Sequence, residues 1–128
     1  MQKEIANRTD IELLINKFYD KVKADELIGL FFTDIIPVDW KKHLPVMYDF
    51  WENTVFGTGN YQGNTMQKHL HLHRLSAIQS NHFERWLLLF NSTVDEHFTG
   101  SNAILIKQRA LSIATVIQIK IANMDKSN

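Results

Sequence analysis

Apolar side chains recur at three- and four-residue steps in four long stretches of this chain, a spacing that places them on one face of an α-helix. The first stretch begins at Thr9 or Asp10, either of which can cap a helix, and it ends near Ala24. Its predicted buried stripe is Ile11, Leu14, Ile15, Phe18, Tyr19 and Val22. A short second helix should follow and end at Pro37; its apolar residues are Leu27, Leu30, Phe31 and Phe32.

The middle of the chain predicts a helix that is disturbed near its start. Asp39 can cap this helix. Pro45 removes a backbone donor and clashes one turn back, so we expect a distorted or 3₁₀ first turn around His43. The inner face of the helix is predicted to carry Trp40, His43, Met47, Phe50, Trp51 and Val55. Three of the five glycines then fall within residues 57–64, which predict a surface loop.

The C-terminal half predicts two long helices. Ser80 or Asn81 can cap the first, and Gly100 stands where such a helix ends. Its predicted stripe is Phe83, Trp86, Leu87, Phe90, Val94 and Phe98. Ser101 begins the last helix, and we expect residues 125–128 to form a disordered tail. The stripe of the last helix is Ile106, Ala110, Ile113, Ala114, Ile117 and Ile121.

These periodicities predict an all-α fold. Apart from a short run of alternating histidine and leucine, no stretch alternates apolar and polar residues as a half-buried strand does. The length suits one hydrophobic core, so we expect a single domain over residues 1–128 with its core from about 9 to 123.

The composition excludes several classes of function. The 14 basic residues balance the 14 acidic ones, so the charge gives no reason to expect a nucleic acid or a membrane surface as a partner. No apolar run approaches the ~20 residues of a membrane helix, and the N-terminus carries no signal-peptide core. The chain has no cysteine, which excludes disulfides, Fe–S clusters and thiolate ligands and fits a reducing compartment. We therefore expect a cytoplasmic protein.

Candidate chemistry centres on His69, His71 and His73, which alternate with leucines. On a helix the first and third share a face, whereas in an extended segment all three do. One imidazole could bind iron, or a pair could bind zinc or copper. Solvated histidines in a turn are the alternative. Phosphate-binding loops, HExxH helices, GxSxG elbows and cysteine nucleophiles are missing from the sequence.

Polar or polar-tipped side chains also interrupt apolar helix faces at Tyr19, His43 and Trp86. Each could be ordinary core with a satisfied hydrogen bond. Alternatively, they could line a cavity and donate hydrogen bonds to a small ligand. The many aromatic residues, Phe31 and Phe32 among them, suit either a wide flat apolar cofactor or a well-filled core.

Several short segments together resemble one known family. The segments are Phe18–Val22; Trp40–His43 followed by Phe50-Trp51; Lys68–Leu70; His82–Leu87; and Thr93–Glu96 with Arg109-Ala110 behind it. In this order and at this spacing they resemble the group III truncated haemoglobins, over nearly the whole chain from about Ile11 to Ile121. That group lacks the paired-glycine motifs of other truncated globins, and this chain has no Gly-Gly.

The resemblance implies a two-over-two helical sandwich that holds one haem b. His69 matches the proximal iron ligand, although a one-turn shift of the alignment would select His71 or His73 instead. Arg74 is a candidate partner for a haem propionate because of its charge and its place just past the ligand. The residues matched to the distal side are Tyr19, His43 and Trp86. The residues expected to contact the haem are Phe32, Met47, Leu72 and Phe83.

The activity implied is binding of O2, NO, CO or peroxide at the haem iron, with NO dioxygenase or peroxidase-like turnover and a reductase as partner. A pocket rich in hydrogen-bond donors suits this chemistry better than bulk oxygen transport. The readings left open are a cofactor-free helical interaction module and a zinc or copper protein that uses the histidine run.

Overall fold

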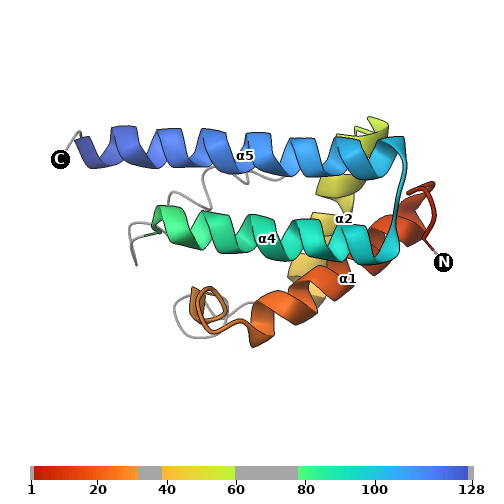
Figure 1. Cartoon of the computed structure of the whole chain (residues 1–128), viewed down its shortest axis with the longest axis horizontal. Helices are drawn as coiled ribbons and strands as arrows, with labels where there is room; N and C mark the ends of the chain where they lie inside the picture. Colours follow the sequence, from red (N-terminus) through yellow and green to blue (C-terminus); the bar gives the residue numbers. More distant parts are fainter. Residues whose placement is uncertain (1, 32–38, 60–77, 127–128) are drawn as a thin grey trace.

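The computed structural model describes residues 2–31, 39–59 and 78–126 (Figure 1). The helices of these residues are α1 (Arg8–Ala24), α2 (Trp40–Phe56), α4 (Ser80–His97) and α5 (Ser101–Lys126). Within the described residues the sole β-type pairing is an isolated parallel bridge between Lys3 and Phe98. The all-α prediction is therefore confirmed.

The helices pack as two pairs. α1 packs against α2 and α4, while α5 packs against α4 and α2. Figure 1 shows α4 and α5 side by side and antiparallel, with α1 crossing below them and α2 behind. This arrangement is the two-over-two sandwich that the sequence predicted. Over the described ranges, no helix is both long enough and apolar enough to cross a membrane.

Aromatic rings fill the centre of the sandwich. Phe90 of α4 is fully buried and stacks on Trp51 of α2, with ring centroids 4.8 Å apart. Phe18 of α1 contacts the Phe90 ring edge-on, with ring centroids 5.2 Å apart. Every residue of the predicted α1 stripe is buried, and so are five of the six in the α5 stripe, Ile113 being half-buried. Helical periodicity therefore located the buried faces of α1 and α5, whereas on the predicted face of α2 only Met47 and Trp51 are buried.

The starts of α2 and α5 agree with the prediction, whereas those of α1 and α4 differ from it by one to three residues. Asn7, and not Thr9 or Asp10, caps α1, because its side-chain oxygen accepts the Asp10 N–H at 3.1 Å. Gln79, and not Ser80 or Asn81, stands at the cap of α4, where its N–H donates to Nδ1 of His82 at 2.9 Å.

Pro45 does not impose the expected 3₁₀ turn. α2 is helical from Trp40 onward, and the His43 N–H donates to the Asp39 carbonyl at 2.9 Å in the α-helical pattern. A proline near a helix start removes one donor without interrupting the helix that follows. In the preceding short segment Leu30 is 41% exposed, whereas Phe31 and Ile28 are buried.

The turn between α4 and α5 corrects two further expectations. α4 ends at His97, and Gly100, with φ of 98°, belongs to the turn that precedes α5. At the other end, α5 continues as helix through Asp125 to Lys126, where we expected a disordered tail.

The N-terminal segment is part of the folded core. Ile5 is fully buried, which extends the core beyond the predicted limit at residue 9. The Glu4 carboxylate accepts the N–H groups of Ser101 and Asn102, at 2.9 and 2.7 Å. This side chain caps the start of α5 from the opposite end of the sequence.

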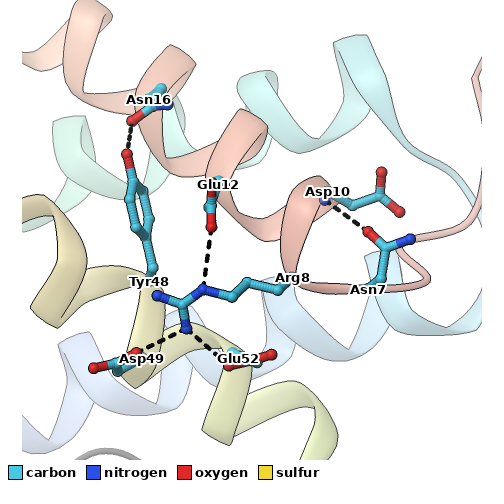
Figure 2. Close-up of polar contacts among 8 residues, drawn as sticks. All are labelled: Asn7, Arg8, Asp10, Glu12, Asn16, Tyr48, Asp49 and Glu52. Atoms are coloured by element: carbon cyan, nitrogen blue, oxygen red, sulfur yellow. Dashed lines mark hydrogen bonds and ion pairs between the residues drawn. The ribbon is translucent and has the colours of Figure 1, made fainter.

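Arg8 links α1 to α2 (Figure 2). Its guanidinium lies 3.1 Å from the carboxylate of Glu12, 2.7 Å from that of Asp49 and 2.9 Å from that of Glu52. The Tyr48 hydroxyl donates to the side chain of Asn16 beside this cluster. These contacts raise the pKa of Arg8 and fix the register between the two helices.

Candidate functional site

Tyr19 and His43 form a polar pair in the apolar contact between α1 and α2. The hydroxyl of Tyr19 lies 3.3 Å from Nε2 of His43. Tyr19 is buried while His43 is half-buried. Burial raises the pKa of the Tyr19 phenol, so the hydroxyl keeps its proton and remains a hydrogen-bond donor.

Trp40 completes a triangle of rings with this pair. Its ring centroid is 5.2 Å from that of Tyr19 and 5.7 Å from that of His43. The ammonium of Lys23, one turn after Tyr19 on α1, lies over the Trp40 ring at 4.9 Å from its centroid. The polar pair is therefore covered by an aromatic ring that is itself covered by a cation.

Trp86 approaches the pair through Phe18 rather than by a direct ring contact. Its ring is half-buried on α4 and meets Phe18 edge-on at 5.6 Å. The Phe18 ring in turn lies 5.1 Å from that of Tyr19. Of the predicted distal trio, the structure joins Tyr19 and His43 directly and places Trp86 on the other side of Phe18.

Two of the predicted apolar contact residues lie in different clusters. Met47, one turn after His43 on α2, is buried in the main core. Phe83, near the start of α4, packs instead with three residues of α5, Ala114, Ile117 and Ile121. It also lines a cavity of about 700 Å³ between the start of α4 and the end of α5.

The remaining candidates lie outside the residues that the structure describes. They are Phe32, His69, Leu72 and Arg74, together with the alternative ligands His71 and His73. Within the described ranges no group of three or more histidine, aspartate or glutamate side chains could hold a metal ion.

Comparison with known proteins identifies the family. The model of the bacterial-like globin family matches residues 3–122. The group 3 truncated hemoglobin ctb of Campylobacter jejuni subsp. jejuni serotype O:2 is 32% identical over 121 residues, which cover 92% of this chain and 93% of that protein. This chain belongs to the bacterial-like globins.

The structural comparison agrees with this assignment. The crystal structure of a group III truncated hemoglobin from Campylobacter jejuni matches with a TM-score of 0.81 at 32% identity, covering 94% of this chain and 95% of that chain. The resemblance to group III truncated haemoglobins is confirmed, and this globin is haem-binding by family. That finding favours the haem interpretation over the interaction module and over the zinc or copper protein.

The chemistry of the Tyr19–His43 pair suits a haem protein with a small ligand. A phenol O–H and an imidazole nitrogen lie 3.3 Å apart, and Tyr19 belongs to the same buried apolar cluster as Phe18 and Met47. Two polar groups in such surroundings suit a ligand that accepts hydrogen bonds.

Sequence reasoning missed two features near the site. The first is the contact between Lys23 and Trp40. The sequence contained a signal for it, because residues three or four positions apart on a helix share a face. Lys23 follows Tyr19 by four residues, and Trp40 precedes His43 by three. The second is the ring contact of His82 with Phe31 at 4.9 Å.

Proposed function

We propose that this truncated haemoglobin holds haem b through His69 and binds O2, NO, CO or peroxide on the side that Tyr19, His43 and Trp86 line. Its chemistry would be turnover of O2, NO or peroxide, as an NO dioxygenase or peroxidase, with electrons from a reductase. The observation that carries the proposal is the buried Tyr19 hydroxyl, 3.3 Å from Nε2 of His43.

Haem b would supply the iron that binds the small ligand and changes oxidation state. The protein side chains then orient and retain that ligand. In the proposed complex the Tyr19 O–H would donate to the ligand, and the Tyr19 oxygen would accept from the protonated Nε2 of His43. The raised pKa of Tyr19 keeps this proton in place.

The remaining contacts are assigned by the family resemblance. We place Phe32, Met47, Leu72 and Phe83 against the porphyrin, and Arg74 beside a propionate. The indole N–H of Trp86 is a second possible donor to the ligand.

The strength of the proposed hydrogen bond from Tyr19 to bound O2 determines whether the protein suits oxygen transport or ligand turnover. A net hydrogen bond contributes about 1 kcal/mol, and more when the acceptor is charged. O2 acquires partial negative charge on binding, so the bond should slow its loss by about fivefold to more than tenfold. Slow release suits reaction on the protein and is unsuited to delivery.

The test is the O2 dissociation rate constant of Tyr19→Phe, measured by stopped-flow mixing of the oxygenated protein with CO. We expect it to rise by about fivefold or more. Tyr48→Phe is the matched control, because it removes a hydroxyl of α2 that donates to Asn16 on the outer surface of the α1–α2 contact. An unchanged rate in Tyr19→Phe would contradict the donor role.

A further inference from the structure

We propose that Lys23 and Trp40 form a latch over the Tyr19–His43 pair and set the rate at which small ligands enter and leave the distal side. The proposal rests on the proposed function of that pair. It adds to the site two residues that do not contact the ligand. Trp40 covers the Tyr19–His43 pair, and Lys23 holds Trp40 in place.

The exposure of the side chains gives the direction of access. Lys23 is exposed, Trp40 and His43 are half-buried, and Tyr19 is buried. Trp40 touches both members of the pair, at 5.2 and 5.7 Å between ring centroids. A small molecule that reaches the Tyr19 hydroxyl from this side must therefore pass the Trp40 ring.

The backbone that carries Trp40 and His43 is weakly held. Asp39 caps α2 without a side-chain hydrogen bond, and the first turn contains no acidic residue. It contains Lys41 and Lys42 instead, and positive charge is unfavourable at a helix N-terminus. Pro45 has no N–H to donate to the Lys41 carbonyl.

Opening of this turn would break the hydrogen bonds of the Lys42 and His43 N–H groups to the Asp39 carbonyl and also the side-chain contacts of Trp40. The Lys23 ammonium, 4.9 Å from the Trp40 ring centroid, supplies one of them by a cation–π interaction from α1. Lys23 is also within 3.8 Å of Asp20, one turn back on the same helix. A loss of the cation should increase the open population by about two- to fivefold.

A latch has a kinetic signature that a ligand contact lacks. It changes the barrier to entry and exit together, so both rate constants rise by the same factor and the affinity is unchanged. A residue that bonds the ligand, as we propose for Tyr19, changes the dissociation rate constant and the affinity. The two proposals can therefore fail separately.

The experiment uses the haem-loaded full chain with CO as the probe, the association rate constant being measured by flash photolysis and the dissociation rate constant by displacement with NO. We expect Lys23→Met to raise both rate constants about two- to fivefold. Lys23→Arg keeps the cation and should restore the wild-type rates. Trp40→Leu removes the ring and should raise both rate constants further.

Two controls separate the latch from general charge effects. Lys17→Met removes the same charge from an exposed position of α1. Asp20→Asn removes the carboxylate beside Lys23 and leaves the cation over the ring. Both should keep the wild-type rate constants.

A spectroscopic measurement checks the contact itself. The chain has three tryptophans, so 5-fluorotryptophan labelling of the ferrous CO form gives three 19F resonances, and Trp40→Phe assigns the one of interest. Lys23→Met should shift this resonance and increase its broadening by a soluble paramagnetic probe, and Lys23→Arg should not. Three results would each overturn the latch. They are unchanged CO rate constants in Lys23→Met, unequal changes of the two rate constants with an altered CO affinity, and a Trp40 resonance that Lys23→Met does not affect.

Discussion

Burial of the Tyr19 hydroxyl has a free-energy cost that burial of its apolar neighbours does not have. Tyr19 stands in a buried stripe of aliphatic and aromatic side chains, where a hydroxyl without a partner is destabilising by about 1–3 kcal/mol. The imidazole of His43 offsets that cost at 3.3 Å. A phenylalanine would fill the same space without the need for a partner. A hydroxyl kept at this buried position supports the proposed role of Tyr19 as a hydrogen-bond donor to the ligand.

The raised pKa of Tyr19 predicts alkaline instability. Above the ordinary tyrosine pKa of about 10 the unfolded chain loses this proton while the folded chain retains it. The contribution to stability is thus complete below pH 10 and is lost as pH rises toward the folded-state pKa. The slope should reach about 1.4 kcal/mol per pH unit for this group.

Urea denaturation between pH 9 and 11 measures the effect. Tyr19→Phe should show a shallower fall of the unfolding free energy with pH than the wild type. Equal slopes in the two proteins would show that Tyr19 ionises as freely when folded as when unfolded.

Among the helices, α5 has the least obvious starting point. Its first N–H groups are satisfied by Glu4, a residue almost the whole chain away in sequence. Desolvation acts to raise the pKa of this carboxyl, but the N–H groups of Asn102 and Ser101 outweigh it and hold the pKa below its ordinary value. Gly100, just before α5, leaves room for the carboxylate.

Gly100→Ala should therefore destabilise the protein for two reasons. A φ of 98° is strained for alanine, and its Cβ would overlap the Glu4 carboxylate. We expect the unfolding free energy in urea to fall by ~1–3 kcal/mol from the strain, with a further loss from the displaced cap. Gly57→Ala is the matched control, because its φ of 69° is strained but no atom lies within 4 Å. An equal loss in both variants would show that the Glu4 contact adds nothing.

The helix interiors and the starts of α2 and α5 could be predicted from the sequence, but the caps of α1 and α4 could not, for a physical reason. Burial of a stripe is fixed by the 3.6-residue period, as with Phe18 and Phe90. The position of a helix cap depends on which of several nearby side chains accepts a free N–H group of the first turn. In α1 this side chain is Asn7 and not Thr9. The docking of Glu4 on α5 joins distant segments, and no local pattern contains it.

The same limit applies to the candidate site. The family resemblance selected Tyr19 and His43, and the structure brings them together. It did not indicate that Phe18 stands between Tyr19 and Trp86, nor that Lys23 lies over Trp40, because both depend on how α1 meets its neighbours. The iron ligand stays a prediction, since His69 lies outside the described residues.

Among the described residues, both apolar and polar contacts join the α1–α2 pair to the α4–α5 pair. The aromatic centre around Phe90 joins α1, α2 and α4, and the N-terminal segment joins the start of α1 to the start of α5. Arg8 adds a polar link within the α1–α2 pair, but such partly exposed ion pairs contribute only ~0–1 kcal/mol each. Most of the stability must therefore come from burial, and a haem that inserts among the helices would add to it by binding the folded state alone.

Haem binding should accordingly raise the melting temperature, and the increase should depend on one histidine. At a free hemin concentration about 100 times the dissociation constant the folded state gains ~2.7 kcal/mol, a rise of roughly 10 °C for a chain of this size. His71→Ala and His73→Ala should keep that rise and the Soret spectrum. His69→Ala should lose most of the rise, because the axial bond is gone and only apolar contacts retain the porphyrin. If His73→Ala lost the rise and His69→Ala kept it, the proximal ligand would be one turn further along the chain.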